Sequence, residues 1–364
     1  MADLQLIVAG RAHAGWNRIR VHRGLEEIAG TFDLGVAERW SATVPPLEVR
    51  AQDACAVRVD GQTLITGHID RAAISYDAHN HGNTVSGRDA TGDLVDCAAE
   101  HGKGEWRNAS IAQIARDLCK PFGIQVSVAG DVGAPFDRYA IEPGETAFDC
   151  IERAARQRGV RLLSDGRGGL VVGVTPAAQA GVSLVEGENL LSCEVANDAS
   201  QRFSKYRVIG QRSGDDDTNG ASAAQIKATA DDAGVVRYRP QVVLVEDQGD
   251  IASFQKRARW EASVRAARAL TATVRVQGWS NGSGLWAPNQ LVRLAAPTAR
   301  IDRELLVRDV DLVVDQSGTF AELVLTPPDA YTLLPIADRK NAPRRRGRKR
   351  ADKSDDVFSV GGDA

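Results

Sequence analysis

Apolar and polar residues alternate along much of the first ninety residues of the chain. The clearest cases are Ile19 and Val21 between Arg18, Arg20 and His22, and Phe32, Leu34 and Val36 around Asp33 and Gly35. Similar patterns occur at 57–59, 64–70 and 84–90. Because successive side chains of a strand point to opposite faces, this pattern predicts an antiparallel sheet or a small barrel with one face buried.

The pattern changes near residue 90. Residues 89–101 are predicted to form a short helix, and two later helices carry N-terminal capping pairs, Ser110 with Gln113 and Thr146 with Asp149. Strand patterns at 124–128, 161–164 and 170–174 accompany them, with the glycines of 165–169 as a hairpin turn. This stretch predicts a small α/β insert.

Strand patterns resume after the insert, at 182–212, 242–246, 271–279, 289–296, 304–315 and 320–327. A loop rich in Asp, Gly and Ser occupies 213–224. A helix is predicted from about Asp250 to Ala269, because one stripe of it is apolar. That stripe consists of Ile251, Phe254, Ala258, Ala262, Ala266 and Ala269. From Pro335 onward the chain is polar and charged, which predicts disorder.

Two segments resemble each other across the insert. LITGHID at 64–70 and LLVRDVD at 305–311 both run from apolar residues to an aspartate, and each follows a shorter Val-Arg strand. Chance similarity and a duplicated β fold both account for this pattern.

The composition fits a β-rich protein of about two to four domains. Of the 364 residues, 43% are hydrophobic, and 35 glycines indicate many turns. The net charge is −3, but residues 337–364 carry +4, so the remaining body carries −7. The sequence has no secretory signal pattern and no apolar run long enough for a membrane span, which predicts a soluble protein made in a cytoplasm.

No residue set predicts a catalytic, cofactor or metal site. The five cysteines, Cys55, Cys97, Cys119, Cys150 and Cys193, lie far apart and are predicted to be reduced, mostly buried thiols. Cys97 and His101 could act together on one helix face, but no oxyanion-hole motif accompanies them, which favours a buried Cys with solvated polar neighbours. Residues 215–220 match half of a calcium loop, yet its twelfth position is Ile226, which favours a solvated hairpin loop.

The strongest charge signal is the segment 343–353. Its cationic candidates are Arg344, Arg345, Arg346, Arg348, Lys349 and Arg350. Such a density can bind phosphates, but no aromatic residues stand among them to stack on bases. Docking on an acidic protein and a solvated tail are the alternatives.

Several segments together resemble the Mu-type phage baseplate hub family, within the wider phage tail hub (late control D-like) family. They lie in order over about 4–333: 15–34, Thr66–Asp70, Val85–Asp89, Pro143–Thr146, 187–211, and Gly278-Trp279 with 285–289. The resemblance implies two tube-like antiparallel β-barrel domains per subunit, in a homotrimer that forms a pseudo-sixfold ring. The implied partners are the tail tube protein, the central spike protein and other baseplate proteins, with DNA only as transiting cargo and no membrane insertion.

This resemblance predicts an α+β, mainly β chain with a first barrel domain at 1–90 and an α/β insert at 91–176. A second barrel domain at 177–335 would contain an inserted loop and helix region at about 213–270, followed by a disordered basic tail at 336–364. The chain would be a non-enzymatic structural subunit without cofactors, assembled in the host cytoplasm into the virion tail baseplate.

Two alternatives remain open. Trp279, Trp286 and Pro288 are candidate interface residues, because tryptophan is enriched at interface hot spots, but they could equally pack in the core or a turn. The segment 139–160 also resembles a LysM repeat, which binds cell-wall glycan; this resemblance suggests a cell-wall-binding or cell-wall-degrading tail protein. A capped helix after a strand explains the same residues without a ligand.

Overall fold

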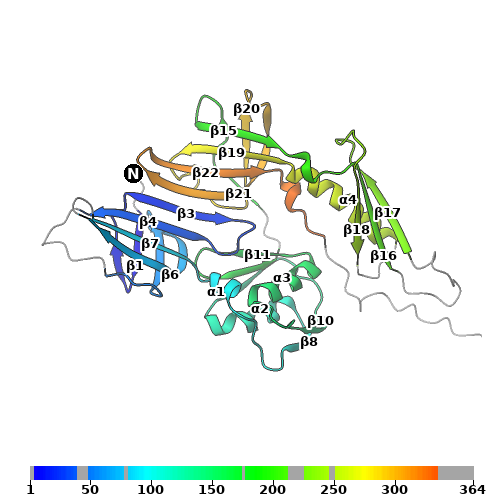
Figure 1. The fold of residues 1–364 in the computed structure, drawn as a ribbon, viewed down its shortest axis with the longest axis horizontal. Helices are drawn as coiled ribbons and strands as arrows, with labels where there is room; N and C mark the ends of the chain where they lie inside the picture. The colour runs from blue at the N-terminus through cyan, green and yellow to red at the C-terminus, as the bar shows by residue number, and fades with distance from the viewer. Residues whose placement is uncertain are drawn as a thin grey trace, which may run out of the picture.

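The structure, a computed structural model, describes residues 4–38, 48–77, 81–173, 177–211, 225–245 and 251–334. Strands dominate, and the longer helices lie in two places, the insert below the sheet and a lobe at the right of the view (Figure 1). The expected mainly β, α+β fold class is confirmed. Within the described ranges, no helix is both long and apolar enough to cross a membrane.

The first β region consists of seven strands. They are β1 (Leu4–Val8), β2 (Arg11–His13), β3 (Arg18–Gly24), β4 (Thr31–Glu38), β5 (Ala54–Val59), β6 (Gln62–Tyr76) and β7 (His81–Asp89). The predicted alternation is confirmed in β3, where Ile19 and Val21 are buried while Arg18 and Arg20 are exposed. These apolar side chains enter a core shared with the second β region.

The second β region begins after the insert. Its strands are β13 (Ala178–Gln179), β14 (Leu184–Val185), β15 (Leu190–Asn197), β19 (Leu270–Gln277), β20 (Gln290–Ala296), β21 (Ile301–Asp315) and β22 (Gly318–Thr326), followed by the 3-10 turn η3 (Pro328–Tyr331).

The two β regions form one continuous sheet of fourteen strands. Its main path runs β15-β19-β22-β21-β3-β4-β7-β6-β5-β1-β2, with β20, β13 and β14 beside it. The connection is an antiparallel pairing of β21 with β3 (Figure 1). The structure therefore differs from two separate closed barrels. Among the described residues, the pairing of β21 with β3 joins the two β regions into one sheet, and this sheet is open at β15 and at β2.

The insert has its own core. Its elements are α1 (Gly92–Asp96), β8 (Glu105–Ala109), α2 (Ile111–Cys119), η1 (Lys120–Phe122), β9 (Val126–Ala129), β10 (Phe136–Ala140), α3 (Ala147–Arg158), β11 (Arg161–Ser164) and β12 (Leu170–Gly173). Both predicted caps form, since Ser110 accepts the Gln113 N–H and Thr146 accepts the Asp149 N–H. The hairpin turn between β11 and β12 is also confirmed.

Two details of the insert differ from the predictions. The helix expected over 89–101 ends at Asp96, because Cys97 already has an extended backbone. The antiparallel pair of β8 and β10 was not predicted from the sequence. Neither strand has the alternation of a half-buried strand, because two exposed residues separate the buried Trp106 and Ala109 in β8 and the buried Phe136 and Tyr139 in β10.

The lobe interrupts the second β region between β15 and β19. It contains η2 (Ala199–Gln201), β16 (Lys205–Gln211), β17 (Gln225–Asp231), β18 (Pro240–Val245) and α4 (Ile251–Arg268). α4 covers one face of the three-stranded sheet, and Phe254 and Ala258 pack there against Val208 and Ala228. The helix predicted from Asp250 to Ala269 is confirmed as α4. Its predicted stripe is only partly correct, because Ala262 and Ala266 are half-buried while Glu261 and Val264 are buried.

Candidate assembly surface

The two β regions contain the same five-stranded unit. We call β3, β4, β5, β6 and β7 the first module, and β15, β19, β20, β21 and β22 the second module. In each module the first strand pairs with the second, the second with the fifth, the fifth with the fourth and the fourth with the third. This order makes the modules topological repeats.

The repeat extends to strand length and to an irregularity in the ladder. β6 and β21 are both 15 residues long, and β7 and β22 are both 9 residues long. The pairing of β6 with β7 shifts between Ile69 and Arg71, and the pairing of β21 with β22 shifts between Val307 and Asp309. A β-bulge bends its strand at a defined place, so a shared bulge fixes the correspondence of the modules.

The bulge also corrects the alignment suggested by the sequence. Asp70 and Arg308 are the bulged residues, so Arg71 corresponds to Asp309 and Ala73 corresponds to Asp311. The similarity of 64–70 to 305–311 aligns Asp70 with Asp311 instead, three residues away. The duplication is present, in a register that the short sequence similarity does not give.

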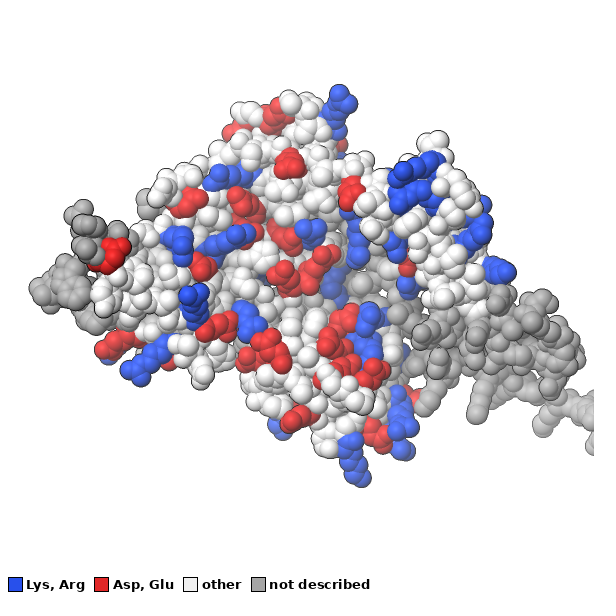
Figure 2. Space-filling view, viewed as in Figure 1, with Lys and Arg blue, Asp and Glu red and all other residues white. Residues whose placement is uncertain are grey.

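The joint between the modules is formed by β21 and β3. Leu312 lies opposite Val21, and both side chains are buried. On the other face, Asp311 lies opposite His22; the Arg20 Nε donates to Asp311 Oδ1 at 2.8 Å, and His22 Nδ1 lies 3.2 Å from Asp311 Oδ2. The outer face of the sheet here carries interspersed acidic and basic side chains (Figure 2).

Electrostatics at this joint favour the ionised pair. The hydrogen bond to Asp311 raises the pKa of His22, against the opposing effect of its burial. Burial alone would raise the pKa of Asp311, but the hydrogen bonds from His22 and Arg20 outweigh it and hold that pKa below its usual value. The joint therefore combines an apolar layer with a charged one.

Each module leaves one strand edge open, and the two edges correspond to the two strands of this joint. β15 pairs with β19 on one edge, and no described strand lies on its other edge. β6 pairs with β5 only up to His68, so on that edge the residues from Asp70 to Tyr76 have no partner strand among those described. Ile74, Tyr76 and Leu191 are exposed on these two strands.

The tryptophan candidates lie elsewhere. Trp279 and Trp286 are both buried in the shared core. The Trp279 Nε1 donates to the backbone oxygens of Val313 and Phe320, at 3.2 and 3.0 Å. Pro288 is partly exposed and lines a cavity of about 50 Å³. This burial favours the core-packing alternative for the two tryptophans.

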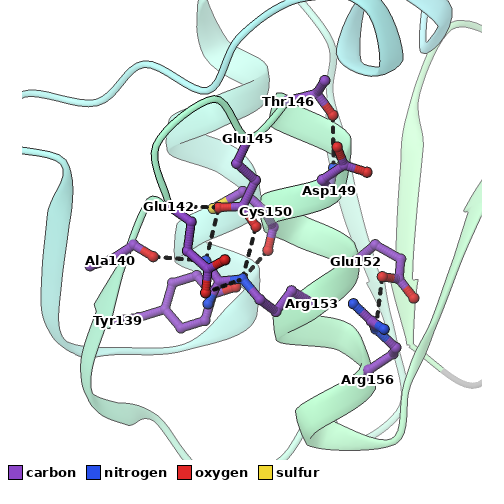
Figure 3. A network of polar contacts seen from close by, with 10 residues as sticks. All are labelled: Tyr139, Ala140, Glu142, Glu145, Thr146, Asp149, Cys150, Glu152, Arg153 and Arg156. Atoms are coloured by element: carbon purple, nitrogen blue, oxygen red, sulfur yellow. Dashed lines mark hydrogen bonds and ion pairs between the residues drawn. The ribbon is translucent and has the colours of Figure 1, made fainter.

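A polar network in the insert occupies the segment with the LysM-like pattern (Figure 3). Arg153 on α3 donates from Nε to Glu145 Oε1 at 2.8 Å and from an amino group to Glu145 Oε2 at 2.9 Å. A third bond from Arg153 reaches the Ala140 oxygen at 2.8 Å. The Tyr139 hydroxyl donates to the Cys150 oxygen at 2.6 Å. These contacts attach the turn at 142–145 to α3.

This network has the chemistry of a structural contact. The Glu145 side chain is only 8% exposed, and although burial opposes it, the hydrogen bonds from Arg153 and the Glu142 N–H keep its pKa below the usual value. Burial raises the pKa of Cys150 to about 12, so its thiol stays protonated. Neither group is suited to proton transfer or nucleophilic attack near neutral pH.

The other candidates do not assemble into a site. Cys97 is exposed, which corrects the expectation of a buried thiol, and it follows the end of α1, so it shares no helix face with His101. His101 stacks on Trp106 with ring centroids 4.4 Å apart. Among the described residues no group of three potential ligands could hold a metal ion. The calcium-like stretch 215–220 and the basic candidates at 344–350 lie outside the described residues.

Protein-family profiles match successive parts of the chain. The profile "Mu phage baseplate assembly protein GpP-like, N-terminal" matches residues 3–89, and "Baseplate hub protein gp44-like, second domain" matches 91–174. "Tail protein NMB1110-like, third domain" matches 202–260, and "Mu phage baseplate assembly protein GpP, fourth domain" matches 251–334.

Individual proteins match over nearly the whole chain. The baseplate hub protein gp44 of Escherichia phage Mu is 36% identical over 346 residues, which cover 91% of this chain and 89% of that protein. The crystal structure of the 43 kDa tail protein of prophage MuSo2 from Shewanella oneidensis is 34% identical and covers 91% of this chain and 100% of that one, with a TM-score of 0.82. The tail protein from Neisseria meningitidis MC58 shares the fold, with a TM-score of 0.76 at 23% identity over 92% of this chain and 99% of that one.

Proposed function

Because the chain belongs to the family of Mu-type phage baseplate hub proteins, we propose that three copies of it form a ring that joins the tail tube to the central spike. As a family member, it is a structural component of the phage tail baseplate and part of the virion. Beyond family membership, we propose a trimer, its closure into a ring, and the tail tube and central spike as its two partners.

The duplicated five-stranded module carries this proposal. Three copies with two similar modules each would provide six similar units around an axis, while the insert and the lobe would repeat only three times. A ring of this kind has true threefold symmetry and approximate sixfold symmetry in the sheet. It could therefore contact a sixfold tube on one side and a threefold spike on the other.

The proposed ring is consistent with the domain boundaries that the sequence predicts. The modules would lie within 1–90 and 177–335 and would complete tube-like walls only when neighbouring copies join. The insert at 91–176 would decorate the outside of the ring. DNA would pass through the central opening as cargo, and the acidic body would not retain it.

We propose a mechanical role without catalytic turnover. The buried carboxylate of Glu145 is held by Arg153, and the Cys150 thiol is protonated, so this polar cluster in the insert has no reactive group. The related proteins are tail and baseplate components by their names.

A cell-wall-binding role is the alternative. A shallow groove of about 580 Å³ lies beside the LysM-like turn, lined by residues 98–102, Gly104 and 141–145. Sedimentation of the protein with purified peptidoglycan tests it. Retention that is lost on substitution of the exposed Glu142 to alanine would support glycan binding in place of a purely structural insert.

The basic segment at 344–350 is proposed to dock on an acidic baseplate partner. Every residue of this segment except Gly347 is Arg or Lys, which favours contact with an acidic surface. Deletion of 336–364 should reduce capture by such a partner, whereas loss of salt-sensitive DNA retention would instead support a nucleic-acid role.

Light scattering coupled to size exclusion tests the ring directly. The expected mass is three times the 39.0 kDa of the chain, about 117 kDa, for the protein alone or after addition of its spike protein. Negative-stain images should then contain a three-lobed annulus. A species that stays at 39.0 kDa with and without the spike contradicts the proposal.

A further inference from the structure

The open edges of the two modules, at β15 and at the end of β6, raise the question of what covers them. An unpaired edge has a row of free N–H and C=O groups, which readily pair with another strand. The correspondence of the modules gives a specific answer here. β15 corresponds to β3, and the end of β6 corresponds to the end of β21, and β3 and β21 are already paired within the chain.

We propose that Arg71–Tyr76 of β6 in one copy pairs antiparallel with Cys193–Asp198 of β15 in the next copy, in the same register that β21 and β3 use. The pairing rests on the proposed ring and names the strands that close it. Joints within a chain would then alternate with joints between chains around one continuous sheet.

The register follows from pairings already described. Within the chain, Leu312 lies opposite Val21 and Val314 lies opposite Ile19. The bulge makes Ile74 the counterpart of Leu312, because Arg71 pairs with Ser86 as Asp309 pairs with Val324. Val195 is the counterpart of Val21, because each pairs with the corresponding residue of the next strand, Ala272 and Phe32.

Between chains, Ile74 would therefore lie opposite Val195 and Tyr76 opposite Cys193. Both β15 residues pack partly against the shared core, and so does Ala72 on β6. The contact would thus extend the existing core layer from one copy into the next.

Burial supports the same contact. Leu312 is 2% exposed because β3 lies beside it, whereas its counterpart Ile74 is 65% exposed. Tyr76 is 83% exposed, although its counterpart Val314 packs against the core. A large apolar residue is costly to leave in water, and two of them on one open edge mark a binding surface.

Charges at the proposed contact are compatible. Arg71 would lie opposite Asp198, which brings opposite charges together at one end of the ladder. At the position of the Asp311–His22 pair, the contact between chains would have Ala73 opposite Ala196. Small side chains allow close approach without an ion pair, so the two kinds of joint would share geometry and differ in chemistry.

Cross-linking through a native cysteine tests the register. In a Cys97→Ser background, Tyr76→Cys places a thiol opposite Cys193 of the next copy, since directly opposite residues of an antiparallel pair lie within about 5.5 Å. A short bis-maleimide should produce covalent dimers and trimers on a denaturing gel. Ser75→Cys, whose side chain points to the other face, should give far less product, and Tyr76→Cys combined with Cys193→Ser should give none.

The possible outcomes separate the register from the ring. Trimers by light scattering with no covalent product from Tyr76→Cys overturn the proposed pairing and leave the ring intact. Protein that remains monomeric with and without spike, and yields no covalent product, overturns both.

A second variant probes the same surface without new thiols. Ile74→Asp should shift trimer dissociation to roughly tenfold higher protein concentration or more, because it places a charge in the extended core layer. Val128→Asp, at an exposed position of the insert, is the matched control and should leave the trimer unchanged. Equal trimer stability in both variants contradicts the proposal.

Discussion

His22 of β3 and Asp311 of β21 form an ion pair across the joint between the two modules, with His22 Nδ1 3.2 Å from Asp311 Oδ2. The two residues are far apart in the sequence, yet they face each other in register. Arg20, two residues before His22 on the same face of β3, donates to the same carboxylate. This pair makes the joint sensitive to pH and to single substitutions.

The stability of the monomer should depend on pH through His22. Its pKa is raised above the usual 6.5 in the folded state, so the stabilisation is fully present below that value and is lost as the pH rises through the raised pKa. The Asp311 pKa is lowered, so its contribution is present above the usual value and is lost as the pH falls through the lowered one. Denaturant unfolding of wild type and His22→Gln should be measured from below the usual His pKa to above the raised His22 pKa. The free energies of unfolding of the two proteins should converge at high pH. Parallel curves would contradict the ion pair.

Asp311→Asn should lower the free energy of unfolding by about 1–3 kcal/mol, because it weakens hydrogen bonds from two cationic side chains in a mostly buried place. Asp302→Asn is the matched control. Its partner Arg293 also binds through two hydrogen bonds, but both side chains are exposed, so the substitution should leave the free energy of unfolding nearly unchanged. Equal effects from both variants would show that the joint is no more sensitive than the surface.

Gly67→Ala should destabilise the first module by about 1–3 kcal/mol or more. A Cβ at this position would lie 2.0 Å from the Arg88 backbone oxygen and 2.7 Å from the Ala90 nitrogen, and backbone cannot move aside cheaply. Gly284→Ala is the control, since a Cβ there meets nothing within 4 Å. Thermal unfolding compares the two; a tolerated Gly67→Ala would mean that the strands separate at this point.

Arg153→Met should cost about 3–5 kcal/mol, because it leaves the buried Glu145 carboxylate without its partner. The double variant Arg153→Met with Glu145→Met should recover much of that loss, since it removes both charges. The loss in the single variant should lessen at acidic pH, where Glu145 can be protonated. Unfolding monitored by the fluorescence of Trp106, which lies in the same core, provides the measurement. No recovery in the double variant would indicate that packing, not charge, holds this turn.

The two buried tryptophans should respond differently to phenylalanine. Both substitutions remove part of a core side chain, but Trp279→Phe also removes hydrogen bonds to two backbone oxygens. The Trp286 Nε1 is buried and finds no acceptor among the described residues. Trp279→Phe should therefore cost about 1 kcal/mol more than Trp286→Phe in chemical unfolding. The opposite order would contradict this account of the core.

Much of the fold could be predicted from local patterns in the sequence. Strand alternation around Ile19 and Val21, the caps at Ser110 and Thr146, and the apolar stripe of α4 each depend on residues a few positions apart. Local physics determines these features, so a single sequence contains them.

The assembly surface could be predicted only in part. The similarity of 64–70 and 305–311 indicates a repeat, but the bulges at Asp70 and Arg308 set its register, and bulges have no distinct signature in these residues. The pairing of β21 with β3 joins residues about three hundred positions apart, which periodicity cannot reveal. Ile74 and Tyr76 are the signal that the sequence contains for this surface, since large apolar residues at the end of a strand are unusual when nothing covers them. Trp279 and Trp286 are of a residue type that predicts an interface, but the structure places both side chains in the core.

The pairing of β3 with β21 has a consequence for how many copies can join. A contact in which one end of a molecule binds the opposite end of the next has no built-in limit: the chain of copies closes only if the turn per copy divides a full circle, and otherwise grows into a helical fibre. In the proposed ring, the joint between β21 and β3 within each copy would supply half of the rotation that relates one copy to the next. Substitutions at the bulge of β21, such as Arg308→Gly, would then alter the curvature of every copy, and electron micrographs should reveal open spirals in place of closed annuli.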